Sequence, residues 1–274
     1  MPEQPTVPLS RSQTRAPSLQ VQNLCVDLGH KPVLHAVNFF CQRGEISAIL
    51  GPNGAGKSTL MRACASLLPY QGSICFEGTP LDNFDARARA QLLTFVPQHS
   101  LLRSALPVRE VVAQGRYASR TGFLQPQSQR AQDQQKVEEA MTRTDTLRFA
   151  ERSYMSLSFG EQRRVLLARG LATGAKLLLL DEPSASLDIG HALELYALMR
   201  RLASQGYTLV VVLHQLGDAL QVADNALLLH RGHVVAHGPT HEVIRDEVIR
   251  DIYGVKMLAN AAPGFKLLDP EASS

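Results

Sequence analysis

A glycine-rich stretch early in the chain constrains the fold more than any other feature. Between an apolar run at 46–50 and a helix-like segment at 57–68, the chain has the pattern G-x-x-x-x-G-K-[ST] of a phosphate-binding loop. A preceding strand and a following helix are the context that this motif needs, so we expect a nucleoside triphosphate site. The residues expected to bind the nucleotide are Gly51, Pro52, Asn53, Gly54, Ala55, Gly56, Lys57, Ser58 and Thr59.

The residue types of this loop suit the chemistry of a triphosphate. Backbone N–H groups converge on phosphate oxygens only where no Cβ intrudes, and Gly51, Gly54 and Gly56 supply that room. The first turn of the following helix adds unbonded N–H groups and partial positive charge. We expect Lys57 to reach the β- and γ-phosphates and the Ser58 hydroxyl to ligate Mg²⁺. A glycine-rich turn without a ligand is the alternative.

Composition limits the remaining function classes. The 274 residues are 45% hydrophobic and 19% charged, and no apolar run approaches the roughly 18 residues of a membrane span. The N-terminus shows no secretory pattern, so we expect a cytosolic chain that needs another protein for any role at a membrane. A net charge of +3 is too small to indicate nucleic acid as a partner. The four cysteines lack C-x-x-C spacing, and we expect free thiols, three of them in the core.

The succession of apolar patterns predicts an α/β fold. Residues 1–17 lack apolar periodicity and are expected to form a disordered tail. Between about 104 and 172 the period changes from two to 3.6, which indicates an inserted helical subdomain, with a loop over 117–132. The leucine run at 177–180 suits a parallel strand buried on both faces. Other strands are expected at 19–28, 33–40, 46–50, 73–77, 92–96, 207–213, 226–229 and 233–236, and helices at 57–68, 85–91, before Gly206 and at 241–253.

Polar side chains follow several predicted strands. Asp181 and Glu182 end the leucine strand, and His214 ends the next. Ligands of open α/β sheets bind at the carboxyl ends of strands. We expect Asp181 to hold Mg²⁺, Glu182 to polarise the water that attacks the γ-phosphate, and His214 to hold that water. Gln98, after the strand at 92–96, is expected to ligate Mg²⁺ weakly; an acidic cluster at a helix N-terminus is the structural alternative for the carboxylate pair.

A second motif points to a family. Segment 157–165 reads Leu-Ser-Phe-Gly-Glu-Gln-Arg-Arg-Val and resembles the signature sequence of ATP-binding-cassette (ABC) proteins. The remaining motifs follow that family's order, with Gln98 before the signature, then the acidic strand, Ser186-Leu187-Asp188 and His214. The resemblance covers about residues 19–250. It implies a P-loop NTPase (RecA-like) core with an antiparallel β subdomain and the helical subdomain, in an ATPase domain at 18–250 with a C-terminal extension at 251–274.

The resemblance also implies an assembly. In this family two cassettes pair head to tail, and each ATP lies between one phosphate loop and the signature of the other copy. Carried over, Ser158, the backbone of Gly160 and Glu161 contact the nucleotide of the second copy, and Asp188 lies near the opposite site. The resemblance therefore implies ATP and Mg²⁺ as ligands, ATP hydrolysis as the activity and a homodimer as the active form.

The chain departs from the family's pattern at several positions. Phe159 stands at the first signature glycine, and Glu161 replaces the usual glutamine. Leu28 falls where the family has an aromatic residue that stacks on adenine, and His30 is the possible substitute. From the missing aromatic we expect modest selectivity for adenine.

Further segments are similar to one group of importers. Segments 96–100, 108–117, 186–191 and 213–216 resemble the ATPases for iron(III)-siderophore, haem and cobalamin uptake, although Gln215 replaces the more usual aspartate. Residues 251–255 resemble their C-terminal F-G-V segment. This resemblance implies uptake of a metal chelate, an iron-siderophore complex first, through separate membrane permease subunits docked near Gln98 and residues 99–117. It also implies a substrate-binding protein and a peripheral location on the cytoplasmic face of the plasma membrane.

Two other functions stay open. One is a cassette ATPase of another transporter class, such as a zinc or manganese importer or an exporter. The other is a regulatory cassette with weakened catalysis, which the residues at Phe159 and Leu28 suggest.

Overall fold

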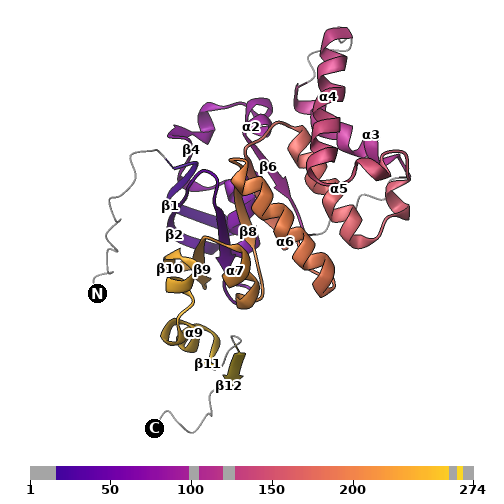
Figure 1. Ribbon diagram of the computed structural model, residues 1–274. Helices are drawn as coiled ribbons and strands as arrows, with labels where there is room; N and C mark the ends of the chain where they lie inside the picture. The colour runs from indigo at the N-terminus through magenta and orange to yellow at the C-terminus, as the bar shows by residue number, and fades with distance from the viewer. Residues whose placement is uncertain (1–16, 99–104, 120–126, 259–263, 268–274) are drawn as a thin grey trace, which may run out of the picture.

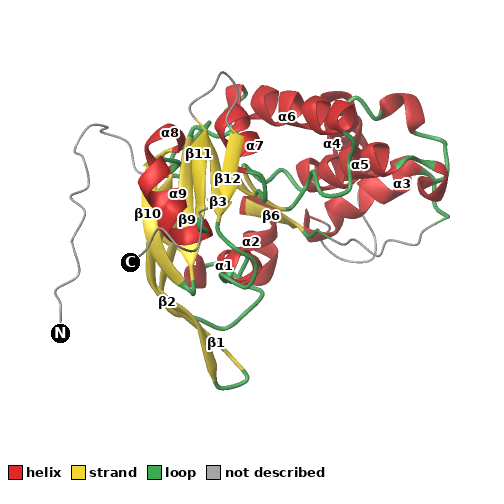
Figure 2. Cartoon of the chain, turned by 90° about the horizontal axis from the view of Figure 1, so that it is seen from below, coloured by secondary structure: helices red, strands yellow, loops and turns green. Residues whose placement is uncertain are grey.

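The computed structural model describes residues 17–98, 105–119, 127–258 and 264–267, so the tail predicted at 1–17 lies almost entirely outside the described residues. Figure 1 shows strands gathered on one side of the molecule and a lobe of helices on the other, and Figure 2 shows the same separation from below. One sheet is mainly parallel and a second is antiparallel. The predicted α/β fold with an antiparallel sheet and a helical insertion is therefore confirmed.

The central sheet has six strands among the described residues. In spatial order they are β10 (His233–Pro239), β9 (Asn225–His230), β3 (Ile46–Leu50), β8 (Thr208–Val212), β7 (Leu177–Asp181) and β6 (Leu93–Val96). All neighbours run parallel except β9 and β10. Every residue of β3, β7 and β8 is buried, because side chains pack on both faces of the sheet. The doubly buried leucine strand is therefore confirmed.

A four-stranded antiparallel sheet shares the core on one face of the central sheet. In spatial order its strands are β2 (Lys31–Cys41), β1 (Leu19–Leu28), β4 (Gln71–Phe76) and β5 (Thr79–Pro80). Leu19 and Leu24 of β1 belong to the same apolar cluster as Leu177 of β7. Gly29 and His30, both at positive φ, form the turn between β1 and β2.

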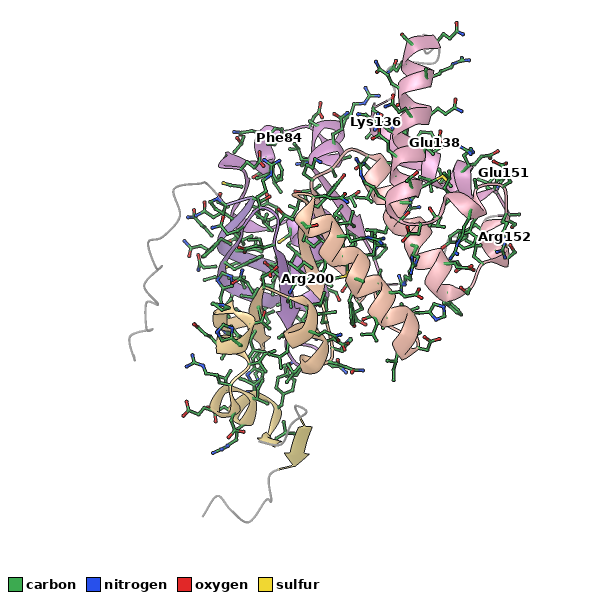
Figure 3. All side chains as sticks on the ribbon, in the orientation of Figure 1. Phe84, Lys136, Glu138, Glu151, Arg152 and Arg200 are labelled. Atoms are coloured by element: carbon green, nitrogen blue, oxygen red, sulfur yellow. The ribbon has the colours of Figure 1, made fainter. Side chains whose placement is uncertain are left out.

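The helical lobe consists of α3 (Val108–Ala113), α4 (Gln127–Arg143) and α5 (Phe159–Ala172). The prediction of a loop over 117–132 is wrong at its end, because α4 begins at Gln127. The first turns of α4 show no apolar period; they are held instead by a buried ion pair, in which Arg116 Nε donates to Asp133 Oδ1 at 2.8 Å. Figure 3 shows Lys136 and Glu138 further along α4, where both are exposed.

The remaining α-helices are α1 (Lys57–Cys64), α2 (Ala86–Leu92), α6 (Ile189–Ser204), α7 (Leu216–Val222), α8 (Thr240–Val243) and α9 (Asp246–Tyr253). Helix α1 is shorter than the predicted 57–68, because Ser66 turns the chain at φ 53°. The single helix predicted over 241–253 is divided in two. Ile244 leaves helical geometry, at φ −89° and ψ 74°, and its side chain is buried.

The C-terminal part holds structure that the apolar pattern does not predict. After Gly254, β11 (Val255–Leu258) pairs antiparallel with β12 (Gly264–Leu267). The expected boundary between residues 250 and 251 falls inside α9. None of the described helices has both the length and the apolar character needed to cross a membrane.

The cysteines are free, as expected. Cys41 and Cys64 are buried, but Cys25 and Cys75 are only partly buried, so the expectation of three core cysteines is wrong. Alternate residues of a strand face opposite sides of a sheet, and Cys25 and Cys75 lie at partly exposed positions of β1 and β4. Burial raises the pKa of Cys41 to about 12 and also raises that of Cys64, which makes both thiols poor nucleophiles.

Candidate functional site

The phosphate loop joins the end of β3 to the start of α1, and two of its glycines are required by the fold itself. At Gly51, where φ is 144°, a Cβ would stand 2.1 Å from the carbonyl oxygen of Leu229. At Gly56, where φ is 102°, a Cβ would stand 2.8 Å from Leu34 Cδ2. The backbone of β9 leaves no room for a side chain at Gly51, whereas at Gly56 the positive φ strains any other residue and Leu34 of β2 would have to shift.

Gly54 has open space around it instead. Its φ is 78°, and no atom lies within 4 Å of the place that a Cβ would occupy. Gly56 caps α1 without any side-chain hydrogen bond, which leaves the N–H groups of the first turn of α1 available to an anion. The loop is therefore an open cradle of backbone donors, and its geometry fits a phosphate group.

Lys57 lies over this cradle. Its Nζ donates to the carbonyl oxygens of Gly51 at 2.7 Å and Pro52 at 3.0 Å. Burial lowers the pKa of Lys57, whereas the nearby carboxylates of Glu182 and Asp181 act in the opposite direction. The ammonium group is thus held between the loop and the acidic strand end.

The ends of three parallel strands bring the predicted polar residues together. Gln98 follows β6, Glu182 follows β7, and His214 follows β8. His214 Nε2 lies 2.5 Å from Glu182 Oε1, and the side-chain amide of Gln98 donates to Glu182 Oε2. Glu182 also has a positive φ of 49°, which is uncommon for any residue but glycine. Both oxygens of this carboxylate are therefore fixed in direction by neighbouring strands.

Asp181 completes this cluster on the side of α1. The Ser58 hydroxyl donates to Asp181 Oδ1 at 3.4 Å. Burial raises the pKa of Asp181, and the hydrogen bond from Ser58 opposes that rise. A hydroxyl and a buried carboxylate beside a phosphate cradle are oxygen ligands of the kind that Mg²⁺ prefers, so this donor set fits the expected metal.

Arg163 of α5 connects the helical lobe to the loop after β6. Its guanidinium donates to the carbonyl oxygen of Pro97 at 3.2 Å and also to that of Gln98. Burial lowers its pKa. Sequence reasoning missed this residue, and the only available signal was a basic residue inside the signature motif.

The signature motif forms the beginning of α5. Ser158 is the N-cap: its Oγ accepts from the backbone N–H of Glu161 at 3.3 Å, and Glu161 Oε2 accepts from the Ser158 N–H at 2.8 Å. This reciprocal capping box fixes the start of the helix. Burial acts to raise the pKa of Glu161, but the hydrogen bonds from Ser158 bring it below its ordinary value. Phe159, in the first turn, is 75% exposed.

The predicted site residues form two groups. The loop group surrounds the phosphate cradle, and the signature group lies at the beginnings of α5 and α6. Among the described residues, no hydrogen bond or ion pair joins the two groups. The loop group consists of residues 51–59, Gln98, Asp181, Glu182 and His214, and the signature group consists of Ser158, Gly160, Glu161 and Asp188.

The end of β1, where the adenine-stacking residue is expected, offers no aromatic ring from β1. Leu28 is 39% exposed at that end. His30, in the adjoining turn, is exposed and has a φ of 65°. The expectation of modest adenine selectivity stays a prediction.

Tyr253 is a second residue that sequence reasoning missed. It ends α9, and its hydroxyl lies close to the backbone of Gly51 in the phosphate loop. Burial raises the pKa of this hydroxyl to about 12, although the Gly51 backbone acts to lower it. The resemblance of residues 251–255 to the C-terminal segment of importer ATPases was the only signal for this position.

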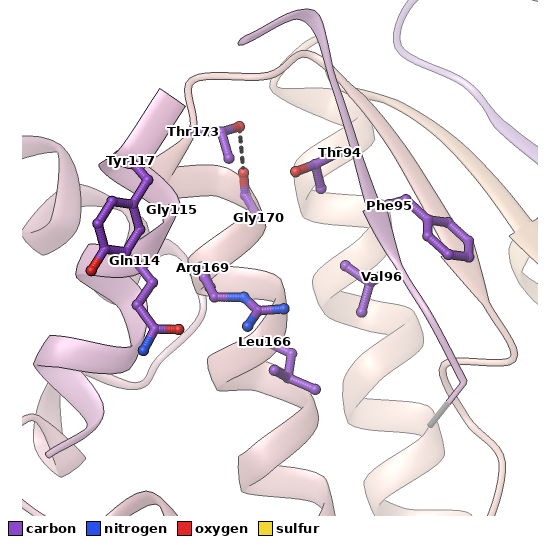
Figure 4. A pocket seen from close by; sticks show the side chains of 10 residues that line it. All are labelled: Thr94, Phe95, Val96, Gln114, Gly115, Tyr117, Leu166, Arg169, Gly170 and Thr173. Atoms are coloured by element: carbon purple, nitrogen blue, oxygen red, sulfur yellow. Dashed lines mark hydrogen bonds between the residues drawn. The ribbon is translucent and has the colours of Figure 1, made fainter. Parts of the chain in front are cut away.

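A hollow of about 300 Å³ lies between β6 and the helical lobe. Figure 4 shows Arg169 and Leu166 of α5 between Gln114 and Tyr117 on one side and β6 on the other. Tyr117 is 65% exposed. No member of the loop group lines this hollow, so it is separate from the phosphate cradle.

Sequence similarity to known proteins covers most of the chain. The sequence profile of the family described as ABC transporter matches residues 34–185. The hemin import ATP-binding protein HmuV of Pseudomonas aeruginosa is 39% identical over 251 residues, which are 89% of this chain and 96% of that protein. HmuV of Streptomyces coelicolor is 39% identical over 253 residues, which are 91% of this chain and 89% of that protein.

Solved structures agree with these sequence relatives. A metal-chelate type ABC transporter in an inward-facing conformation matches with a TM-score of 0.78 and 28% identity, over 93% of this chain and 98% of that one. CbiO1 of Clostridium perfringens, part of the transporter complex cbiONQ, matches with a TM-score of 0.75 and 27% identity, over 86% of this chain and 94% of that one. The similarity therefore extends well beyond the phosphate loop.

Proposed function

The chain belongs to the ABC transporter family and is an ATP-hydrolysing subunit, and on this premise we propose that it powers import of a metal chelate through a separate membrane permease. The observation that carries the proposal is 39% identity over 89% of the chain with a protein named for hemin import. A metal-chelate type transporter among the structural neighbours supports the same cargo class. Haem is therefore the first candidate, ahead of the iron-siderophore complexes expected from sequence, and cobalamin follows.

The loop group supports a division of roles around ATP and Mg²⁺. The open backbone donors of the loop bind the phosphates, and Lys57 turns from the carbonyls of its own loop to the β- and γ-phosphate oxygens. Ser58, Asp181 and Gln98 hold Mg²⁺, which when bound neutralises charge on those oxygens.

Glu182 is the residue that we assign to the chemical step. It accepts the proton of the attacking water, whose oxygen bonds to the γ-phosphorus while the bond to the β-phosphate oxygen breaks. His214 and Gln98 contact the two oxygens of this carboxylate, so its orientation is set before the water arrives. His214 then also contacts the γ-phosphate.

We propose that a second copy of the chain completes the site. Ser158 and Asp188 of the signature group are exposed, whereas Glu161 is half-buried and Gly160 is buried. The group lies at two helix N-termini, which attract anions. In a head-to-tail pair, the Ser158 hydroxyl and the Gly160 backbone face the γ-phosphate held by the other copy. Binding of ATP at both interfaces closes the pair, and hydrolysis reopens it.

The permease docks, in this proposal, at the hollow beside β6. The hollow is lined by Gln114, Gly115 and Tyr117, which belong to the segment 99–117 expected from the family resemblance to contact the permease. Arg163 and the loop of Gln98 connect this region to Glu182. The chain then lies peripherally on the cytoplasmic face of the membrane, and a substrate-binding protein delivers cargo from the other side.

Transport in reconstituted vesicles tests this function. The chain is co-expressed with its permease, and uptake of haem, an iron-siderophore complex and cobalamin is measured with ATP inside or outside the vesicles. We expect haem uptake that needs ATP on the side of the cassettes and stops with Glu182→Gln. Uptake of a zinc or manganese ion instead contradicts the proposal and favours a cassette of another transporter class. ATP binding without any turnover also contradicts it and favours a regulatory cassette with weakened catalysis.

A further inference from the structure

One side chain connects the two exposed turns of the signature group. Asp188 begins α6, and Gly160 lies in the first turn of α5. The imidazole of His191 lies between them: its Nδ1 is 2.7 Å from Asp188 Oδ2, and its Cδ2 would be 2.9 Å from a Cβ on Gly160. His191 ends the segment 186–191 that resembles importer ATPases, but neither that resemblance nor the proposed chemistry gives its side chain a role.

Asp188 fixes this imidazole with both of its oxygens. A carboxylate only accepts hydrogen bonds, so Nδ1 carries a proton and donates it to Oδ2. The other oxygen, Oδ1, accepts the backbone N–H of His191 at 2.8 Å, which is the N-cap bond of α6. Any rotation of the ring away from α5 therefore breaks a short hydrogen bond.

The ring occupies the space that a side chain at Gly160 would fill. The three atoms nearest to the place of a Cβ are Cδ2, Cγ and Cβ of His191, at 2.9, 3.3 and 3.4 Å. The φ of Gly160 is not positive, so steric room decides this position and not backbone geometry. Gly190 differs: only Asp188 Oδ1 comes near, at 3.5 Å, which is an ordinary van der Waals contact.

We propose that His191 is a positioning residue that fixes the signature turn to the Asp188 turn, so that both meet the second copy as one unit. In this proposal, position 160 is a glycine because only glycine leaves room for the His191 ring of the same chain. The competing explanation is that Gly160 is glycine only because a phosphate of the second copy approaches its backbone. The inference rests on the proposed dimer, since positioning matters only if another copy uses these turns.

A rescue experiment separates the two explanations. The full-length chain with Glu182→Gln is compared with versions that add Gly160→Ala, His191→Ala, both, or the control Gly190→Ala. Light scattering gives the chain concentration at which half the protein is dimeric in MgATP. A fluorescent ATP analogue gives the nucleotide affinity of the undimerised chain, which is expected to equal that of the Glu182→Gln parent because none of the added substitutions lies in the loop group.

We expect Gly160→Ala to raise the dimerisation concentration by about tenfold or more and His191→Ala by about threefold, with Gly190→Ala equal to the parent. The double variant is expected to dimerise better than Gly160→Ala alone, because removal of the ring makes room for the new methyl group. His191→Asn, which keeps a donor for Asp188, is expected to lie nearer to the parent than His191→Ala.

A double variant that dimerises no better than Gly160→Ala overturns the inference and leaves the proposed dimer standing. It would mean that the methyl group added by Gly160→Ala clashes with the second copy of the chain and does not clash with His191. A parent that stays monomeric in MgATP contradicts the proposed dimer itself, and the inference falls with it.

Discussion

The loop group and the signature group differ in how far the chain itself holds them. In the loop group, Lys57 and Asp181 are each 6% exposed, and both oxygens of Glu182 have partners from neighbouring strands. At the signature group, Phe159 is 75% and Ile189 81% exposed. Both of these large apolar side chains lie at the start of a helix of the signature group, and exposed apolar side chains are typical of a surface that binds another molecule where they form a patch. The difference shows that the side chains of the loop group are held by contacts within the chain, whereas the signature group lies beside side chains that face solvent.

The largest effect is expected from Glu182→Gln. The amide keeps the size of the side chain but cannot take a proton from water, so turnover should fall by about 100-fold to 10,000-fold. Binding of a fluorescent ATP analogue should remain, since the phosphate cradle is unchanged. Phosphate release measured beside analogue binding checks both statements, and a variant that hydrolyses ATP at a rate near that of the parent would remove Glu182 from the chemical step.

Lys57→Ala should have the next largest effect, on affinity and not on chemistry. It removes charge-assisted hydrogen bonds to phosphate, each of about 1.5–3 kcal/mol, so the ATP dissociation constant should rise by about 100-fold. Equilibrium binding of the analogue measures it, with Lys176→Ala, on the short turn before β7, as the matched lysine control. Normal affinity in Lys57→Ala contradicts the assignment of the cradle.

A smaller gain is expected from Leu28→Tyr. An aromatic face at the end of β1 adds about 0.5–1.5 kcal/mol of stacking, so ATP should bind about threefold to tenfold more tightly. GTP provides the comparison for base preference. Unchanged affinity and unchanged preference show that this position lies away from the base.

The smallest effect is expected on stability at the exposed half. Phe159→Ala should change the free energy of unfolding by no more than about 0.5 kcal/mol, since the ring has few contacts within the chain. Leu166→Ala, in the same helix but 3% exposed, should cost about 2–5 kcal/mol. Urea unfolding measures both, and a large loss for Phe159→Ala shows that this side chain supports its own fold.

Prediction from sequence worked best where a local residue pattern is compatible with only one kind of structure. The phosphate loop and the buried strand β7 follow from glycine spacing and from an unbroken leucine run, and both are confirmed in the fold. Convergence of Gln98, Glu182 and His214 followed from the rule that parallel strands end at one edge, and the structure brings these three side chains into contact. Their roles toward ATP stay predictions.

Prediction failed where tertiary contacts decide. Helix α4 starts in a polar stretch whose support, the Arg116 to Asp133 pair, comes from a segment outside the helix. The contact of Tyr253 with Gly51 joins residues from opposite ends of the chain, and no periodicity signals it. The contact of His191 with Gly160 was not predicted for the same reason, because Gly160 belongs to another helix.

Complementation between two defective chains tests most directly whether the site is shared between copies. One chain carries Lys57→Ala, which damages the loop group, and the other carries Ser158→Arg, which damages the signature group; both carry Glu182→Gln and different fluorophores at the N-terminus. If the halves come from different copies, the mixture contains one intact site, and energy transfer should rise with MgATP although neither chain dimerises alone. If one chain supplied both halves, neither partner would hold an intact site, and a mixture without any MgATP-dependent transfer would contradict the account.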